Sequence, residues 1–151
     1  MPAIQRANPY GAFKFKVEFG AVAGGQPIGA GFSDVSGLGS EVNYSEYREG
    51  TDKPNTVRKI PNTFKLDEIT LKRGLIGSTE IFAWFKAVRD GQYQPRSVSI
   101  VVLDEAGAEV AEIGLTNAQP KKWVGPTLAA KGGGEVAMEE LHLVHEGLEY
   151  R

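Results

Sequence analysis

Two histidines near the C-terminal end, His142 and His145, are the only imidazole groups of the chain, and Glu146 follows the second directly. Imidazole and carboxylate groups hold zinc when they converge on one point. The residues around them alternate as in a β-strand, however, and residues three apart on a strand point to opposite faces of the sheet. We therefore predict no metal site. His142 should lie among polar groups on one sheet face, and His145 should pack at a strand end or meet a neighbouring subunit.

Two pairs of adjacent acids, Asp67-Glu68 and Glu139-Glu140, supply carboxylates that could take part in acid–base chemistry. Adjacent residues on a strand face opposite ways, so neither pair forms an acid and base by itself, and we expect solvated faces instead. The glycines of residues 131–134 lack the Lys-Ser/Thr ending and the following helix of a phosphate-binding loop. The chain has no cysteine, and no serine stands in a nucleophile elbow. The sequence therefore predicts no catalytic residue and no cofactor.

The overall charge is close to neutral. The 151 residues carry 17 Lys and Arg against 19 Asp and Glu, a formal net charge of −2. Sequence-specific nucleic-acid binding needs a clustered basic surface, which pairs such as Lys121-Lys122 are too sparse to build. Charges at Lys14 and Lys16 interrupt the apolar residues near the N-terminus, which predicts that no export signal is present. No run of about 18 apolar residues occurs, so we expect no direct insertion into a membrane.

Strands are expected where apolar and polar residues alternate. Residues 13–19 read Phe-Lys-Phe-Lys-Val-Glu-Phe, which predicts a half-buried strand with one dry face. A second strand is predicted over 28–35, where Gly29 and Gly31 suggest a bend or bulge. The glycines of 36–39 end it, and a third strand follows over 41–48.

The segment 49–62 differs from its surroundings, because it holds Pro54, Pro61 and mixed charges with few large apolar groups. We predict a long excursion outside the core, of the kind that is usually functional or disordered in compact domains. A strand should resume over 64–72. Its alternation slips near Asp67-Glu68, which predicts a bulge there.

One helix is predicted after residue 78. Ser78 is a suitable N-cap and Gly91 a suitable C-terminal stop. Apolar residues between them follow the 3.6-residue period, and we expect all of them to face the core: Ile81, Phe82, Trp84, Phe85 and Val88.

The rest of the chain is predicted to be mostly strand. Residues 97–103 and 109–115 should form a hairpin, because Asp104-Glu105-Ala106-Gly107 has turn chemistry. We then expect a short strand at 120–123, one turn of helix at 126–130, a flexible glycine tip at 132–134 and a closing strand at 136–146. About seven or eight strands with one helix predict a mainly β single domain over 1–151, a β-barrel or two-sheet sandwich whose helix plugs an edge.

Several short blocks, spread in order along nearly the whole chain, carry a family resemblance. They are Asn8-Pro9-Tyr10, Gly31 to Leu38, Glu46 to Gly50, Ile69 to Gly74, Asn117 to Trp123 and His145 to Leu148. On these blocks the chain resembles the inner tube protein of contractile phage tails and phage-tail-like injection systems.

The resemblance implies a protomer that closes into hexameric rings, which stack into a hollow tube inside a contractile sheath. Besides other copies of the chain, the expected partners are the sheath protein, baseplate and terminator proteins, and a cargo or tape-measure protein in the lumen. The protein would be made in the bacterial cytoplasm and become part of a phage tail or of a particle that is released or membrane-attached. An open β structure agrees with this, since edge strands carry unpaired backbone groups that neighbours in a ring can satisfy.

We expect subunit contacts in an extended assembly loop around 49–62, because an irregular mixed-charge segment of this length is hard to justify in an isolated domain. The contact is predicted to lie between rings. The residues predicted to take part in subunit contacts are Glu46, Tyr47, Arg48, Glu49, Asp52, Lys53, Arg58, Lys59, His145 and Glu146.

The sequence is also compatible with two other classes of protein. A monomeric small-ligand-binding β-barrel fits the strands and aromatic residues, but it requires an apolar cavity. An enzyme fits least well, because no nucleophile, base or metal-binding set converges in the sequence.

Overall fold

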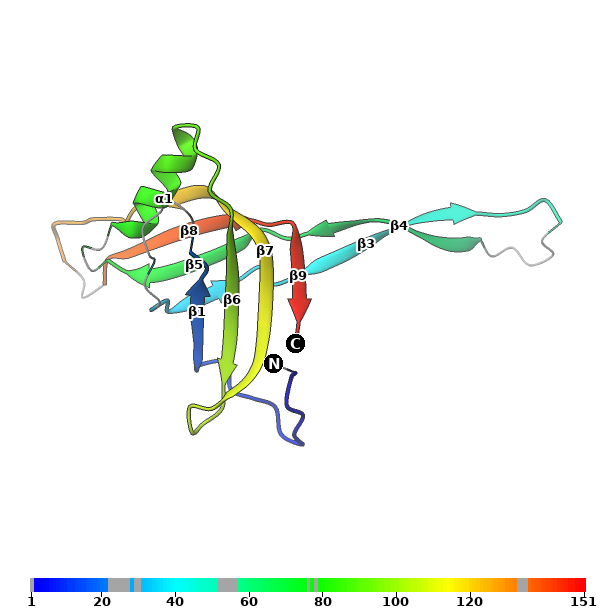
Figure 1. Ribbon diagram of the computed structural model, residues 1–151, viewed down its shortest axis with the longest axis horizontal. Coiled ribbons are helices and arrows are strands. Elements are labelled where there is room, and N and C mark those ends of the chain that lie inside the picture. The colour runs from blue at the N-terminus through cyan, green and yellow to red at the C-terminus, as the bar shows by residue number, and fades with distance from the viewer. Residues whose placement is uncertain are drawn as a thin grey trace.

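The computed structural model describes residues 2–21, 28, 31–51, 57–75, 77, 79–132 and 136–151. The elements follow one another as β1 (Phe15–Phe19), β2 (Asp34–Ser36), β3 (Ser40–Tyr47), β4 (Arg58–Leu66), β5 (Ile69–Gly74), α1 (Glu80–Arg89), β6 (Arg96–Leu103), β7 (Glu109–Val124), β8 (Met138–Val144) and β9 (Gly147–Tyr150). The fold is mainly β with one helix, as predicted. Figure 1 shows a body of crossed strands from which β3 and β4 project far to one side.

Seven strands form one strongly bent antiparallel sheet, in the order β1-β6-β7-β8-β5-β2, with β9 also paired to β7. In Figure 1, β1, β6 and β9 run nearly vertically while β5 and β8 run across them. The sheet therefore folds over on itself as two crossed layers, the orthogonal form of sheet packing. The buried core between the layers consists of Val17, Val98, Ile100, Leu115, Ala118, Ile69, Leu71, Leu141 and Leu143, together with Ile81 and Trp84 of the helix.

β7 connects the two layers. It was predicted as separate strands at 109–115 and 120–123, but it is one 16-residue strand. Its first part pairs with β6 and β9 and its last part with β8. Between them Asn117 adopts a positive φ of 48°, and the pairing with β8 shifts register after Pro120. The interruption seen in the sequence is a change of partner and not the end of a strand.

The predicted hairpin is present between β6 and β7. Asp104 Oδ1 accepts hydrogen bonds from the backbone N–H groups of Ala106 and Ala108 at 2.9 and 2.8 Å. Gly107 has a φ of 87° and donates its N–H to the carbonyl of Asp104. The turn chemistry that predicted this hairpin is therefore the chemistry that closes it.

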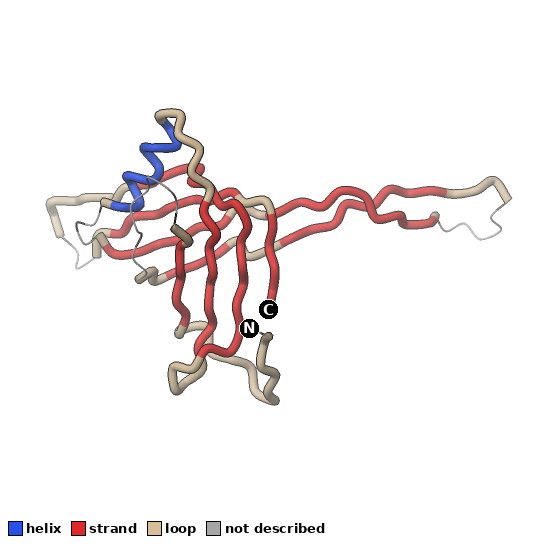
Figure 2. The backbone as a smooth tube through the Cα atoms, in the orientation of Figure 1, coloured by secondary structure: helices blue, strands red, loops and turns tan. Residues whose placement is uncertain are grey.

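The helix α1 lies at one end of the body, where it covers the crossed layers (Figure 2). Ile81 and Trp84 are buried, whereas Phe82 is 36% exposed and Phe85 is half-buried. The prediction that the whole apolar set faces the core is therefore wrong at Phe82. Thr79 occupies the N-cap position without a side-chain hydrogen bond, and the predicted cap Ser78 lies outside the described residues. No helix within the described ranges is long and apolar enough to cross a membrane.

Several other element predictions need correction. The strand predicted over 28–35 is confined to β2; residues 29–30 lie outside the described part. The helical turn predicted at 126–130 is irregular backbone, and most of the tip at 132–134 lies outside the described ranges. The closing strand ends at Val144, and a further strand, β9, was not predicted.

The predicted single strand over 64–72 is two strands of different sheets. β4 ends at Leu66, and β5 begins at Ile69 in the seven-stranded sheet. Asp67 and Glu68 are the link between them and not a bulge. The slip in alternation marks the passage from one sheet to another.

β3 and β4 form a two-stranded antiparallel ribbon of their own. We call the segment Ser40–Leu66, which contains both strands, the arm. The prediction of an irregular segment over 49–62 is wrong from Arg58 onwards, because 58–62 belong to β4; residues 52–56 lie outside the described part. Pro61 sits within β4, opposite Tyr44 and next to a register shift. A ribbon of two edge strands tolerates a proline that a central strand would exclude.

Candidate assembly surface

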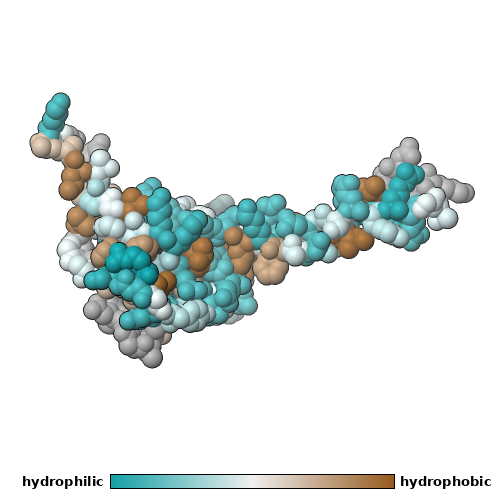
Figure 3. Space-filling view, turned by 90° about the horizontal axis from the view of Figure 1, so that it is seen from above, coloured by the Kyte–Doolittle hydropathy of each residue, from teal (hydrophilic) through white to brown (hydrophobic). Residues whose placement is uncertain are grey.

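The arm exposes nearly its whole surface, since every residue of β3 and all of β4 except Leu66 are exposed. Large apolar side chains are included. The exposed ones on or beside the arm strands are Val42, Tyr44, Tyr47, Val57, Ile60 and Phe64. Figure 3 shows the corresponding apolar patches spaced along the projecting arm between hydrophilic stretches. An isolated two-stranded ribbon is marginally stable in water, so these side chains are available for contact with another molecule.

Polar pairs across the two strands hold the arm in register. The Asn43 amide donates to Thr63 Oγ1 at 3.2 Å, and the Asn62 amide donates to Ser45 Oγ at 2.9 Å. Lys59 forms an ion pair with Glu46 directly opposite it. Exposed ion pairs contribute only about 0–1 kcal/mol, so these groups define the register more than they stabilise the arm.

The residues predicted from sequence to make subunit contacts fall into two groups in space. Six described residues belong to the outer arm: Glu46 and Tyr47 at the end of β3, Arg48 and Glu49 after it, and Arg58 and Lys59 on β4. Asp52 and Lys53 lie outside the described residues. Arg58 Nη1 lies 3.7 Å from Glu49 Oε1, an ion pair within the arm. His145 and Glu146 lie elsewhere, where the arm joins the body.

The root of the arm is held by backbone contacts. Asp67 N–H donates to the carbonyl of Gly39 at 3.1 Å. Gly37 has a φ of 85°, and a Cβ there would lie 1.9 Å from the carbonyl oxygen of Glu68, so only glycine fits at this position. The two ring nitrogens of His145 lie 3.2 Å from the carbonyl oxygen of Asp67 and 3.0 Å from that of Gly147. His145 therefore packs at a strand end, one of its two predicted positions, and connects the arm root to the corner between β8 and β9.

Glu146 also faces its own chain at this corner. Its Oε2 accepts a hydrogen bond from the Asn117 side-chain amide at 3.0 Å, and its N–H donates to the carbonyl of Thr116 at 2.8 Å. These contacts fix the bend of β7 at Asn117, where the sheet turns from one layer to the other. Within the described chain, Glu146 has a structural role next to the arm root.

His142 lies in a polar network on the outward face of β5 and β8, which confirms its predicted position. Its Nδ1 is 2.9 Å from Glu68 Oε1, and its Nε2 is 3.3 Å from Glu140 Oε2. A hydrogen bond from Lys121 and a weaker one from His142 lower the pKa of Glu68. At Glu140, burial opposes ionisation, but hydrogen bonds from Lys72 and His142 outweigh it and lower the pKa. No group of three or more metal-binding side chains converges within the described ranges.

A buried ion pair lies at the end of the molecule opposite the arm, and the sequence did not predict it. Arg73 and Glu139 are each 3% exposed, and Arg73 Nε donates to Glu139 Oε1 at 2.5 Å. Trp123 Nε1 donates to the other carboxylate oxygen at 3.1 Å, and Glu80 Oε1 lies 3.8 Å from Arg73 Nη1. Glu139 was expected on a solvated face. The expectation was wrong because Glu139 shares the inward face of β8 with Leu141.

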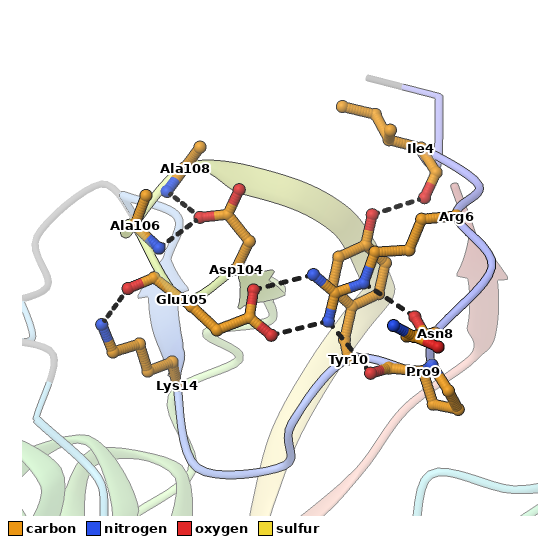
Figure 4. Close-up of polar contacts among 10 residues, drawn as sticks. All are labelled: Ile4, Arg6, Asn8, Pro9, Tyr10, Lys14, Asp104, Glu105, Ala106 and Ala108. Carbon is orange, nitrogen blue, oxygen red and sulfur yellow. Dashed lines mark hydrogen bonds and ion pairs between the residues drawn. The ribbon is translucent and has the colours of Figure 1, made fainter.

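The N-terminal segment is fastened across the β6–β7 turn (Figure 4). Two Arg6 nitrogens donate to the two carboxylate oxygens of Glu105, each at 2.7 Å. The Arg6 guanidinium also lies 3.9 Å from the ring centroid of Tyr10, and Lys14 Nζ donates to the Glu105 carbonyl at 2.7 Å. The bidentate hydrogen bond from Arg6 lowers the pKa of Glu105 to about 2.

A cavity of about 550 Å³ opens between the layers near β1, β2 and β5. Apolar side chains such as Phe15, Ile100 and Val102 line it together with the charged Lys14 and Lys72. Its volume lies in the range of roughly 300–1,000 Å³ typical of small-molecule sites. This cavity is the feature that a ligand-binding barrel would use.

Comparison with protein families gives one match, which spans residues 11–149: the T4-like virus tail tube protein gp19. Comparison with curated protein sequences gives no significant match.

Three solved structures illustrate the similarity of the fold. A chain of the 6-fold symmetrised baseplate of the anti-feeding prophage (AFP) has a TM-score of 0.84 and 23% identity, with 97% of both chains covered. A chain of the PVC sheath-tube complex, an extracellular contractile injection system in the extended state, has a TM-score of 0.80 and 26% identity; 95% of this chain and 91% of that chain are covered. Hcp1 from Flavobacterium johnsoniae is more distant, with a TM-score of 0.52, 15% identity and coverage of 90% and 93%.

Proposed function

Because this chain belongs to the T4-like virus tail tube protein family, we propose that its copies close into hexameric rings that stack into the hollow inner tube of a contractile phage tail or phage-tail-like injection system. The observation that carries the inter-ring part of this proposal is the arm. A two-stranded ribbon with exposed apolar side chains is marginal alone and gains stability when a partner covers it. The arm of one ring contacts the next ring, through the outer residues that include Glu46, Tyr47, Arg58 and Lys59.

The comparisons support the remaining parts of the assembly. A ring of six agrees with the 6-fold symmetry of the AFP baseplate, in which a similar chain occurs. A sheath around the tube agrees with the PVC sheath-tube complex, and a terminator with a PVC sheath/tube terminator chain of 25% identity. Baseplate, terminator and sheath proteins are therefore the partners that we propose, with a cargo or tape-measure protein in the lumen.

The tube acts as a conduit without catalysis of its own. A channel that must release its contents cannot bind them strongly, so a polar and mostly inert lumen suits this role. We propose synthesis in the bacterial cytoplasm, followed by incorporation into a tail or tail-like particle.

The cavity between the layers supports a second candidate function, a monomeric small-ligand-binding β-barrel. The two functions differ in what the purified protein does at high concentration. Negative-stain electron microscopy should show rings or tubes under the first proposal and only small featureless particles under the second.

A shortened arm tests the inter-ring contact directly. Tyr44 and Pro61 are cross-strand partners, so residues 45–60 can be replaced by Asn-Gly, which favours a tight two-residue turn. The described residues among those removed are exposed, so the protomer should keep its fold and its melting temperature. We expect rings that do not stack. Tubes of normal length from a correctly folded shortened protein would refute the inter-ring contact.

A further inference from the structure

A small pocket lies at the end of the molecule that carries α1, where β5 ends and β8 begins. We call it the helix-end pocket. It has a volume of about 240 Å³ and is lined by Leu75, Gly77, Thr79, Phe82, Trp123 and Glu139. This volume is below the roughly 300–1,000 Å³ of typical small-molecule sites. A single large side chain is therefore a better match for it than a free ligand.

The chemistry of the helix-end pocket selects among side chains. Phe82 and Trp123 meet edge to face, with ring centroids 5.0 Å apart, and Leu75 is 45% exposed beside them. Two polar side chains are among the described residues that line these apolar walls: Thr79 and Glu139, whose carboxylate accepts from Arg73 and Trp123. An ionised carboxylate offers about four acceptor positions. An aromatic ring that carries one hydroxyl donor, a tyrosine, satisfies both the walls and the carboxylate.

The arm presents such a tyrosine: β3 projects away from the end that carries α1 (Figure 1), and Tyr47 is its last residue. Tyr47 is 48% exposed, and Ile60 beside it is 46% exposed. The register pairs Ser45 with Ile60 and Tyr47 with Arg58, so alternation places Tyr47 and Ile60 on the same face of the arm. Complementary surfaces at opposite ends of one molecule produce head-to-tail contacts, which continue from copy to copy.

We propose that Tyr47 of one copy, flanked by Ile60, inserts into the helix-end pocket of a copy in the adjacent ring, where its hydroxyl donates a hydrogen bond to Glu139. This inference rests on the proposed stacking of rings and names the surface that receives the arm. It assigns the partially exposed Phe82 a role as part of a docking site. It also gives the buried carboxylate that lines this pocket a third hydrogen-bond donor, besides Arg73 and Trp123.

A disulfide trap tests the contact, because the native chain has no cysteine. Arg58 is opposite Tyr47 on the same arm face, and Thr79 lines the pocket. The double variant Arg58→Cys/Thr79→Cys should therefore form crosslinked ladders when tubes are oxidised. The matched control, Lys59→Cys/Thr79→Cys, moves the arm cysteine to the other face and should crosslink weakly. The two sites lie at opposite ends of one copy, so a disulfide, which needs Cα atoms within about 7 Å, must join two copies. Tubes of the first variant without such crosslinks would overturn the proposal.

Conservative substitutions test the hydrogen bond. Tyr47→Phe keeps the ring and removes the hydroxyl, so the critical concentration for tube growth should rise about tenfold, as expected for a hydrogen bond to a charged group. Tyr44 pairs with Pro61 and lies on the opposite face of the arm from Tyr47. Tyr44→Phe should therefore leave the critical concentration unchanged. Equal effects of the two substitutions would contradict a specific site for Tyr47.

Mixing two blocked variants separates this proposal from ring stacking in general. Tyr47→Arg disables the arm, and Phe82→Arg fills the pocket at a partially exposed position; each variant alone should give single rings, after its melting curve confirms a folded protomer. A mixture should give stacks of two rings, because the native arms of a Phe82→Arg ring can enter the native pockets of a Tyr47→Arg ring. Normal tubes from Phe82→Arg would overturn the proposal that the pocket receives Tyr47. Loss of the rings themselves would mean that the contact lies within a ring, which would also overturn it. Neither outcome affects the shortened-arm experiment, which tests stacking itself.

Discussion

Arg73 and Glu139 are directly opposite each other on β5 and β8, at positions that continue the inward rows of Leu71 and Leu141. A buried ion pair adds little net stability, but the loss of one partner leaves an uncompensated buried charge. Glu139→Ala should therefore destabilise the protomer by about 3–5 kcal/mol, as measured by urea denaturation of the unassembled protein.

Glu140 provides the control for this measurement, because it is the neighbouring residue and faces outward. Its ion pair with Lys72 is partly exposed, so Glu140→Ala should change the free energy of unfolding by about 1 kcal/mol or less. If both substitutions had the same small effect, the Glu139 carboxylate would not be buried in solution.

Glu105 should report whether the N-terminal segment is fastened. The pKa of Glu105 in the folded protein is about 2, below its ordinary value of 4.5. The contact with Arg6 therefore contributes its full stabilisation when the pH is above 4.5. The contribution is lost as the pH falls toward 2. In Arg6→Ala, NMR titration should show the pKa of Glu105 returning toward its ordinary range. An unchanged titration would mean that Arg6 does not contact Glu105 in solution.

At the scale of the elements, α1 is anchored by two buried side chains, Ile81 and Trp84. Trp84 is 2% exposed, meets Phe19 edge to face and donates its Nε1–H to the carbonyl of Gln94 at 2.8 Å. Trp84→Ala should cost about 3–5 kcal/mol as a large-to-small core change. Phe82→Ala, at an exposed position of the same helix, should cost clearly less. Melting temperatures of unassembled protomers check the difference, and a reversed order would mean that the helix packs through its other face.

Local patterns were sufficient to predict elements that have one partner and one buried face. The alternation around Val17 predicted β1, and the turn residues around Asp104 predicted the β6–β7 hairpin. Where a strand changes partner, the local signal was misread. Asn117 interrupts the pattern of β7 without ending the strand, and Asp67 separates two sheets although the flanking residues resemble one strand. Partner exchange depends on distant residues, which the local sequence does not contain.

The candidate surface was predictable only in part. The unusual composition of 49–62 indicated an assembly segment, but Pro61 concealed a strand that exists because the ribbon has two free edges. The inward position of Glu139 could have been found from its spacing of two and four residues from Leu141 and Leu143. Its partner could not, because the pairing with Arg73 depends on the register between β5 and β8.

At the scale of the whole molecule, the arm and the body should differ in local stability. The body strands bury a common core, whereas the described arm residues are almost all exposed. Amide hydrogen exchange in unassembled protomers should therefore be fast over residues 40–51 and 57–66 and slow in β6 and β7. Assembly into tubes should slow exchange in the arm selectively. Equal protection of the arm before and after assembly would contradict its role in the inter-ring contact.

The short link between β4 and β5 also has a mechanical consequence. The arm and β5 run in nearly the same direction (Figure 1), and β5 is bonded along its length to β8. A pull on the arm therefore loads the β5–β8 ladder in shear, so that its hydrogen bonds share the force and do not open one after another. In single-molecule pulling from the arm turn, the protomer should resist a higher force than when it is pulled from the C-terminal end of β9, which can peel from β7. The arm is thus attached in a geometry that resists a pull along its own axis.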